Sequence, residues 1–256
     1  GEGGTLKPNF WRAVTDNDMG ANINIAQKVW KNPVMTLQTL EAKQQKTGTM
    51  VTAFYRMDSV QALLTLQYFI GENGTIQVSQ QLQTNKKAST PNLFRFGMVM
   101  DLPYEMEKSV YYGRGPIENY PDRKLSQRIG RYEQMADDQF YPYIRPQETG
   151  TKGDMRWWKQ TDRQGIGLKV VADAPFYASA THYTIPDVDD GDRKEQRHSY
   201  QLKRSCFTEL YLDGAHAGVG GIDSWSGWAE ALEPYQVKCE DRAFTFWLLP
   251  TETVGD

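Results

Sequence analysis

Residues 62–83, ALLTLQYFIGENGTIQVSQQLQ, decide the fold class of this 256-residue chain. Apolar and polar side chains alternate over residues 62–70 and again over 76–82, which is the two-residue period of a strand with one wet face. Between the two runs stands Gly71-Glu72-Asn73-Gly74, a typical hairpin turn. Because the strands of a parallel sheet are apolar throughout, the pattern predicts an antiparallel sheet.

The same period continues on both sides of this hairpin. Further strands are expected at residues 51–57, 93–100, 165–172, 176–183, 207–212 and 243–249. Apolar side chains at helical spacing predict one short amphipathic helix at 21–32, and residues 193–200 are expected to form a short polar helix. Strands at such short spacing predict an all-β fold, a large antiparallel β-sandwich that spans residues 1–256 as a single domain.

Composition excludes several classes of protein. A hydrophobic share of 39% and an aromatic share of 12% support a sizeable core. The net charge of -3 supplies no basic field for nucleic acid, and no apolar run has the length of a membrane span. Cys206 and Cys239 are expected to be buried free thiols, and the three histidines lack the spacing of metal ligands, so the sequence predicts no metal site.

One loop, residues 111–123, combines rigid backbone with charge. Gly113 and Gly115 are followed by Pro116 and Pro121, and these residues restrict the backbone to particular conformations. The charged side chains of the loop are therefore held in fixed directions. These side chains are Arg114, Glu118, Asp122 and Arg123. Residue chemistry alone favours a buried ion-pair loop that clamps the ends of two strands over a catalytic loop.

A second loop, residues 213–228, is rich in glycine and carries Trp225 and Trp228. It lacks the pattern of a phosphate-binding loop. An indole on such a loop suits stacking on the C–H face of a sugar, although residue type alone favours a tryptophan in the core. Carboxylates in the loops could form a glycosidase pair, and His182 or His216 with Glu148 could act as acid and base, but no spacing supports either arrangement.

Three motifs are longer and more specific. They are Gly113-Arg114-Gly115-Pro116-x-Glu118-Asn119-Tyr120-x-Asp122-Arg123, Tyr143-x-x-Pro146-Gln147-Glu148-x-Gly150 and Gly218-Val219-Gly220-Gly221-x-Asp223-Ser224-Trp225. With Pro8-Asn9-Phe10-Trp11-Arg12-Ala13-x-Thr15-Asp16-Asn17-Asp18-x-Gly20, they span almost the whole chain. Together they resemble the C-terminal domain of β-galactosidases of glycoside hydrolase family 2.

The resemblance implies a supersandwich of the galactose mutarotase-like type, which is one piece of a larger enzyme that hydrolyses terminal β-D-galactosides such as lactose with retention. It places both catalytic glutamates in a preceding TIM-barrel domain, so that this chain alone holds no catalytic residue and is expected to be inactive. It assigns Trp225 to the sugar-binding wall, with Asp223 and Ser224 holding the indole. The structural loop residues that it implies are Arg114, Glu118, Asn119, Asp122, Arg123 and Glu148.

The implied partners are a β-galactoside or galactose and the preceding domains of the same polypeptide, with no nucleic acid and no membrane. The resemblance implies no cofactor in this chain, because the magnesium, sodium or calcium of such enzymes belongs mainly to the other domains. The parent enzyme could be a homo-oligomer. The sequence leaves open its preferred galactoside and whether it is a soluble protein of the cytoplasm or the periplasm.

Two other interpretations remain at this stage. A freestanding aldose epimerase of the mutarotase-like fold would need His182 or His216 across a cleft from Glu148. A carbohydrate-binding module would need an exposed, level aromatic patch that contains Trp225 and Trp228.

Overall fold

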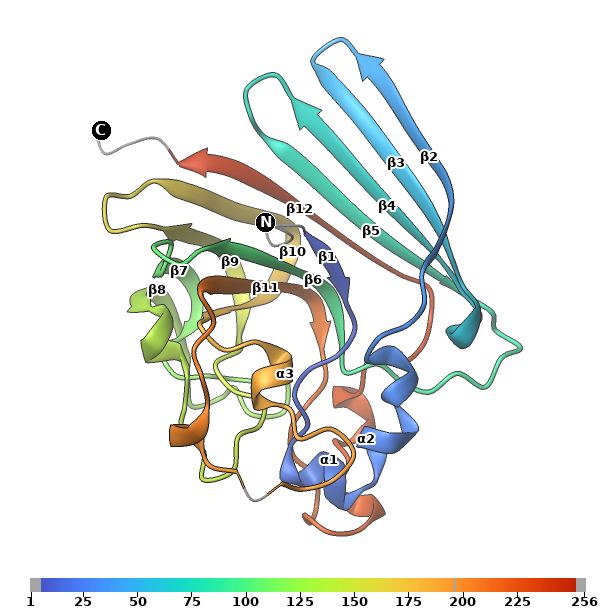
Figure 1. Cartoon of the computed structure of the whole chain (residues 1–256), viewed down its shortest axis with the longest axis vertical. Helices are drawn as coiled ribbons and strands as arrows, with labels where there is room; N and C mark the ends of the chain where they lie inside the picture. Colours follow the sequence, from blue (N-terminus) through green and yellow to red (C-terminus); the bar gives the residue numbers. More distant parts are fainter. Residues whose placement is uncertain (1–5, 196, 252–256) are drawn as a thin grey trace.

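The computed structural model describes residues 6–195 and 197–251, which form a sheet of twelve antiparallel strands (Figure 1). The strands are β1 (Lys7–Asn9), β2 (Thr36–Gln45), β3 (Gly48–Met57), β4 (Ala62–Gly71), β5 (Ile76–Thr84), β6 (Arg95–Pro103), β7 (Lys108–Gly115), β8 (Arg128–Met135), β9 (Lys152–Thr161), β10 (Gly167–Thr181), β11 (Phe207–His216) and β12 (Arg242–Thr251). The helices are α1 (Asp16–Gly20), α2 (Ile23–Ala26) and α3 (Ile185–Val188). Single 3-10 turns are η1 (Lys28–Trp30), η2 (Asp58–Val60), η3 (Ala136–Gln139), η4 (Ser199–Gln201), η5 (Gly227–Ala229) and η6 (Glu233–Tyr235).

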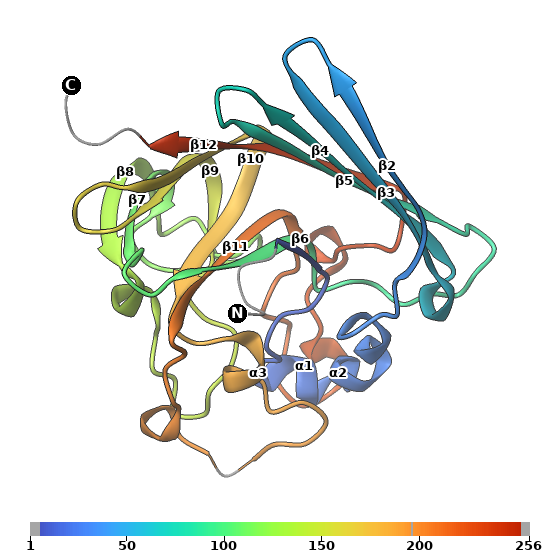
Figure 2. The same cartoon turned by 45° about the horizontal axis from the view of Figure 1, so that its top comes forward.

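Strand β10 connects two layers of the sheet. Its first part, from Gly167 to Ala172, pairs with β12, which continues into β5, β4, β3 and β2. Its second part, from Tyr177 to Thr181, pairs with β11, which continues into β6 and β1. Because β10 shifts register between Val171 and Phe176, the sheet bends there, and the two groups of strands diverge in Figures 1 and 2.

The core lies on the inner face of this bent sheet. Alternate side chains point inward, and those of Leu64 on β4, Val78 on β5, Phe96 on β6 and Phe246 on β12 are fully buried. Strands β4 and β5 are therefore covered on one face, as their alternating sequence requires, whereas every residue of the edge strand β2 is exposed. The loops at the lower end of Figure 1 carry α1, α2 and the segment after β11, and they form the candidate site described below.

The antiparallel all-β class is confirmed, and the hairpin at residues 71–74 joins β4 to β5. The two strands expected at 165–172 and 176–183 are one strand, β10, whose irregular residues mark a change of partner. The helix expected at 193–200 is wrong, since these residues run without helix up to η4; Gln196 lies outside the described residues. The expected helix at 21–32 is present as α2 and η1, which Gln27 separates.

Both cysteines are free, but Cys206 is exposed and Cys239 is only half-buried, so the expected burial is wrong for Cys206 and incomplete for Cys239. Cys206 lies between a polar loop and β11, in a stretch without an apolar period that could have placed it. Among the described residues, no helix has the length and apolar character needed to cross a membrane.

Truncating one inward side chain of the central hairpin tests the core. We expect Leu64→Ala to lower the free energy of unfolding by about 3 kcal/mol, because Leu64 is fully buried and its loss leaves a cavity. The neighbour Leu63 is 51% exposed on the opposite face, so Leu63→Ala is the matched control with a much smaller effect. Urea unfolding measures both, and equal losses in the two variants would contradict the assigned faces.

Candidate functional site

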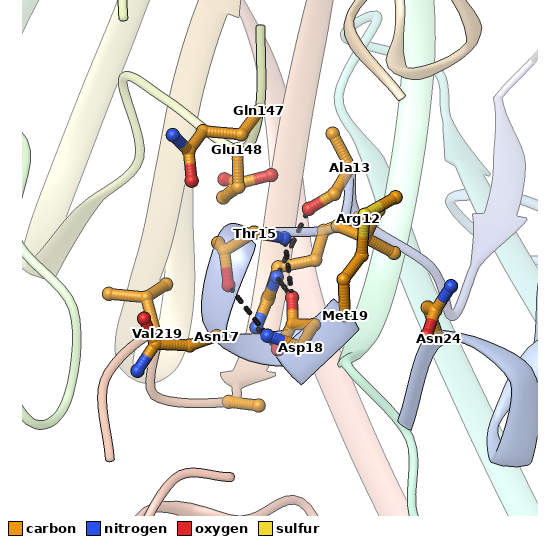
Figure 3. Close-up of polar contacts among 12 residues, drawn as sticks. Arg12, Ala13, Thr15, Asn17, Asp18, Met19, Asn24, Gln147, Glu148 and Val219 are labelled. Carbon is orange, nitrogen blue, oxygen red and sulfur yellow. Dashed lines mark hydrogen bonds and ion pairs between the residues drawn. The ribbon is translucent and has the colours of Figure 1, made fainter. Parts of the chain in front are cut away.

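The candidate site lies at the loop end of the sheet, where four segments of the chain meet. They are residues 12–20 with α1, the loop of residues 116–123 after β7, residues 143–150 before β9, and the glycine-rich loop, which in the structure comprises residues 217–228 after β11. Figure 3 shows Asp18, Gln147, Glu148 and Val219 around Arg12. Segments that are distant in sequence therefore share one small region.

A buried arginine organises the first segment. Arg12 has no exposed surface and donates to Asp18 Oδ1 at 3.1 Å and to the carbonyl of Gly218 at 3.1 Å. The Thr15 hydroxyl accepts from the Asp18 backbone N–H, and Asp18 Oδ2 accepts from the Thr15 N–H at 2.7 Å, which forms a capping box at the start of α1 (Figure 3). One carboxylate thus neutralises Arg12 and also fixes the helix that follows.

The glycine-rich loop is held from both sides. Asn17 Nδ2 donates to the carbonyls of Asp223 at 2.9 Å and Ala229 at 3.3 Å. On the other side, Asp122 Oδ2 accepts from the backbone N–H groups of Val219 at 2.9 Å and Gly220 at 2.8 Å. These bonds join the segment of residues 8–20 and the loop of residues 116–123 to the glycine-rich loop.

The same loop approaches α1 very closely. A Cβ atom on Gly20 would lie 2.2 Å from the carbonyl oxygen of Ser224, so a side chain at this position would displace the loop. Only glycine permits this contact of backbone with backbone. The requirement for glycine at position 20 therefore comes from its contact with Ser224, which lies about two hundred residues further along the chain.

Trp225 is presented on this anchored loop. Its side chain is 78% exposed, and that of Trp228 is 70% exposed, so the core location favoured by residue type is wrong for both. Asp223 Oδ1 accepts from the backbone N–H groups of Trp225 at 3.2 Å and Ser226 at 3.1 Å. The hydrogen bond from the Ser226 hydroxyl lowers the pKa of Asp223, which favours the carboxylate that makes these contacts. Ser224 is exposed beside the indole.

The loop of residues 116–123 is closed by Glu118. This carboxylate contacts Arg123 and the Tyr143 hydroxyl and accepts from the Gly150 N–H at 2.7 Å and the Thr149 hydroxyl at 3.0 Å. It thus joins the loop of residues 116–123 to residues 143–150 before β9.

Asn119 of this loop and Arg114, which lies on β7 and not in the loop where it was expected, contact the start of β9. Asn119 accepts from the Gly153 N–H at 2.9 Å and donates to the Arg114 carbonyl at 3.0 Å. Arg114 itself forms an ion pair with Asp154 at 2.8 Å. The loop is therefore tied to the first residues of β9.

A cluster of charged side chains lies buried beneath these loops. Arg95 on β6 lies 3.5 Å from Glu148 Oε1 and 3.5 Å from Asp213 Oδ2, while His216 Nε2 is 3.6 Å from Glu148. All four side chains are almost completely shielded from water. We refer to these four residues as the Arg95 cluster.

The Arg95 cluster has strongly shifted pKa values. Burial alone would raise the pKa of Glu148, but the charge of Arg95 and the contact with His216 outweigh it and lower this pKa to about 2. Burial raises the pKa of Asp213 to about 7, because Arg95 only partly replaces the lost water and Glu148 adds a like charge. Burial and then the charge of Arg95 lower the pKa of His216 to about 4. At neutral pH, Glu148 is therefore ionised and His216 is neutral.

The Arg95 cluster offers no room for a sugar. The cavity bordered by Arg95, Glu148 and Tyr211 has a volume of about 20 Å³, which suffices for one water molecule and not for a pyranose ring. His182 lies elsewhere, stacked on Tyr104 at 4.1 Å and 3.7 Å from Glu107. His216 and Glu148 do meet, but inside the protein and not across a cleft, as an epimerase would require.

Sequence reasoning missed Arg95 and Lys152 as site residues. Arg95 stands between the buried Phe94 and Phe96, and a charge inside such an apolar run was the available signal. Lys152 donates to the Gly150 carbonyl at 2.9 Å, and burial lowers its pKa to about 7. Asp213 was expected in a loop, whereas it lies on β11. Among the described residues, no group of three or more potential ligands could hold a metal ion.

Comparison with known proteins gives a consistent result. The model of the family described as beta galactosidase small chain matches residues 3–248. Beta-galactosidase from Lactobacillus delbrueckii subsp. bulgaricus is 34% identical over 220 residues, which cover 84% of this chain and 21% of the relative. Beta-galactosidase from Priestia megaterium is 29% identical over 222 residues, which cover 86% of this chain and 21% of the relative. The chain thus spans about a fifth of the length of these relatives.

Among solved structures, a GalM/aldose epimerase homologue from C. elegans aligns with a TM-score of 0.44 and 8% identity, covering 84% of this chain and 69% of that protein. A GH36 alpha-galactosidase from Geobacillus stearothermophilus aligns with a TM-score of 0.43 and 10% identity, covering 87% of this chain and 29% of that protein.

Removing the Asp122 carboxylate tests how the glycine-rich loop is held. In Asp122→Ala, we expect the amide protons of Val219 and Gly220 to exchange at least about tenfold faster, because each loses a hydrogen bond to a charged acceptor. Hydrogen exchange followed by NMR measures both rates. Asp173→Ala, which changes an exposed carboxylate of β10, is the control. Unchanged protection in a folded Asp122→Ala variant would refute this anchoring role.

The Arg95 cluster predicts a specific pH dependence. Asp213 has a folded-state pKa above its unfolded value, so the stability that it contributes is present below pH 4 and is lost as the pH rises toward about 7. We expect Asp213→Asn to match the wild type near pH 4 and to exceed its free energy of unfolding near pH 8, by an amount on the order of a few kcal/mol. Urea unfolding at both pH values measures the difference. A variant that is less stable than the wild type at pH 8 would contradict the assigned protonation.

Proposed function

Because the chain belongs to the beta galactosidase small chain family, we propose that it is a domain of a β-galactosidase of glycoside hydrolase family 2, which hydrolyses terminal β-D-galactosides such as lactose with retention. In this proposal the domain supplies part of the sugar-binding wall and not the catalytic groups. The observation that carries it is Trp225, an indole that is 78% exposed on a loop anchored from two other segments.

The anchoring gives the exposed indole a binding role. Exposure of an apolar ring system of this size to water is unfavourable in free energy. Stacking on the C–H face of a galactose ring would remove the ring system from water. Asn17 and Asp122 fix the loop before a ligand arrives, so little conformational entropy is lost on binding. Asp223 orders the turn, and Ser224, the residue before Trp225 in the chain, is an exposed polar group.

The buried carboxylates do not suit catalysis. A retaining glycosidase needs two carboxyl groups about 5 Å apart that flank an accessible glycosidic bond. Glu148 and Asp213 are shielded from water and engaged with Arg95. In our proposal the catalytic glutamates, and any bound magnesium, sodium or calcium, lie in a TIM barrel elsewhere in the polypeptide, as the resemblance to glycoside hydrolase family 2 implies.

The loop end also offers a surface for that barrel. Several large apolar side chains are exposed on its loops, namely Ile117, Leu125, Tyr141, Ile144, Ile222, Trp225, Trp228 and Leu232. So much exposed apolar surface is typical of an interface. In our proposal the preceding domains of the same polypeptide contact this end and complete the pocket around Trp225.

Complementation tests the proposal. We expect this chain alone to leave a chromogenic β-galactoside intact, and the chain mixed with the remaining part of the parent enzyme to hydrolyse it. In the mixture, Trp225→Ala should lower kcat/KM at least about tenfold, because the sugar loses its stacking plate. Leu63→Ala, which removes an exposed apolar side chain of β4 outside this surface, is the control.

Two outcomes would refute the proposed function. Hydrolysis by the chain alone would place the catalytic carboxylates within it. Unchanged kinetics of a folded Trp225→Ala variant would remove the indole from the pocket.

A further inference from the structure

A row of aromatic side chains crosses the outer face of the sheet. In the strand register, Phe69 on β4 lies opposite Gln77 on β5, which lies opposite Trp247 on β12. The row continues through Val171 on β10 to Trp157 on β9 and Tyr112 on β7. The chain neighbours of these residues, Val78, Phe246, Val170, Trp158 and Tyr111, are buried, so the row itself points away from the core.

An open hollow lies at one end of this row. Phe69 and Trp247 border it together with Gln77, and the two turns of the neighbouring hairpins complete its rim. The rim residues are Thr47, Gly71, Glu72, Asn73 and Thr75. Its volume of about 460 Å³ falls in the range of sites for small ligands.

The walls of the hollow are fixed. A Cβ atom on Gly48 would lie 2.9 Å from Phe69 Cζ, so the phenyl ring rests directly on the backbone of β3. In the rim, Asn73 Oδ1 accepts from the Thr75 N–H at 3.1 Å, and the Glu72 N–H donates to the Thr47 carbonyl at 3.2 Å. Such a preformed wall limits the ordering cost of binding.

An uncharged polar row runs beside the aromatic one. Thr52, Gln67, Ser79 and Thr245 pair with one another across β3, β4, β5 and β12, two residues along from the aromatic positions. The Thr245 hydroxyl donates to the Ser79 hydroxyl at 3.2 Å. On the outer face, a row of hydroxyl and amide groups therefore lies next to the row of aromatic side chains.

We propose that this face binds a neutral β-linked oligosaccharide, with one sugar ring in the hollow between Phe69 and Trp247. A pyranose has an apolar C–H face and hydroxyl edges, which match the aromatic and the polar row respectively. An apolar protein partner would leave the polar row unpaired. Phe69 and Trp247 stand two strands apart, about 10 Å, so an extended chain places alternate sugars over these two rings. Trp157 lies a further two strands along, and the ammonium group of Lys169 already covers its ring at 5.5 Å.

Titration of the 256-residue chain with β-1,4-galactotetraose tests this site. We expect the indole N–H signal of Trp247 to shift in NMR spectra. In Trp247→Ala, affinity should fall at least about tenfold, while Leu63→Ala, which changes another exposed side chain of β4, binds the tetraose as before. Lactose, which spans fewer rings, should bind more weakly than the tetraose. Gln77→Ala changes a polar side chain of the hollow without touching the core, and it should weaken binding as well.

Three results would overturn the proposal. The first is the absence of any shift at the highest soluble concentration of tetraose. The second is binding that Trp225→Ala abolishes and that Trp247→Ala and Gln77→Ala leave unchanged, which would assign the sugar to the glycine-rich loop and support the proposed function alone. The third is a shift of Trp247 that depends on protein concentration without sugar, which would mark this face as the contact with a second copy of the chain.

Discussion

The structure depends on arginines that have no access to water. Such a charge must be matched by carboxylates and carbonyls at close range, because removing it from water without partners is very costly. Arg95 draws Glu148 and Asp213 together, and Arg12 joins Asp18 to the carbonyl of Gly218. Their partners come from α1, β11 and the loops before β9 and after β11. Satisfying two guanidinium groups therefore fixes the positions of most of the segments that form the loop end.

This arrangement explains why the polar motifs surround one exposed indole. The residues between the buried arginines and Trp225 make backbone contacts: Asn17 holds the loop on one side and Asp122 on the other. The rigidity of the loop thus originates in the charged interior and reaches the surface through a short series of hydrogen bonds. A binding residue presented in this way has its orientation set before any ligand or neighbouring domain is present.

The fold was largely predictable from sequence, whereas the interior of the site was not. The period of two identified the hairpin of β4 and β5, because their alternation reflects one covered face. Two strands were predicted at residues 165–172 and 176–183, but the interruption between them belongs to the bend of β10. Arg95 pairs with Glu148 and Asp213, which are distant from it in sequence, and no local sequence pattern predicts such pairs. The exposure of Trp225 also results from tertiary contacts, so residue type alone pointed to the core.

The double pairing of β10 has a consequence for folding kinetics. One half of this strand needs β12 and the other needs β11, so the two layers cannot complete their hydrogen bonds before β11 and β12 have been synthesised. Pairs such as β6 with β11 and β5 with β12 close loops of more than a hundred residues. Contacts of such high sequence separation fold slowly, because the loop entropy is lost before they form. We therefore expect the two layers to fold and unfold together, as one cooperative unit that forms late in folding.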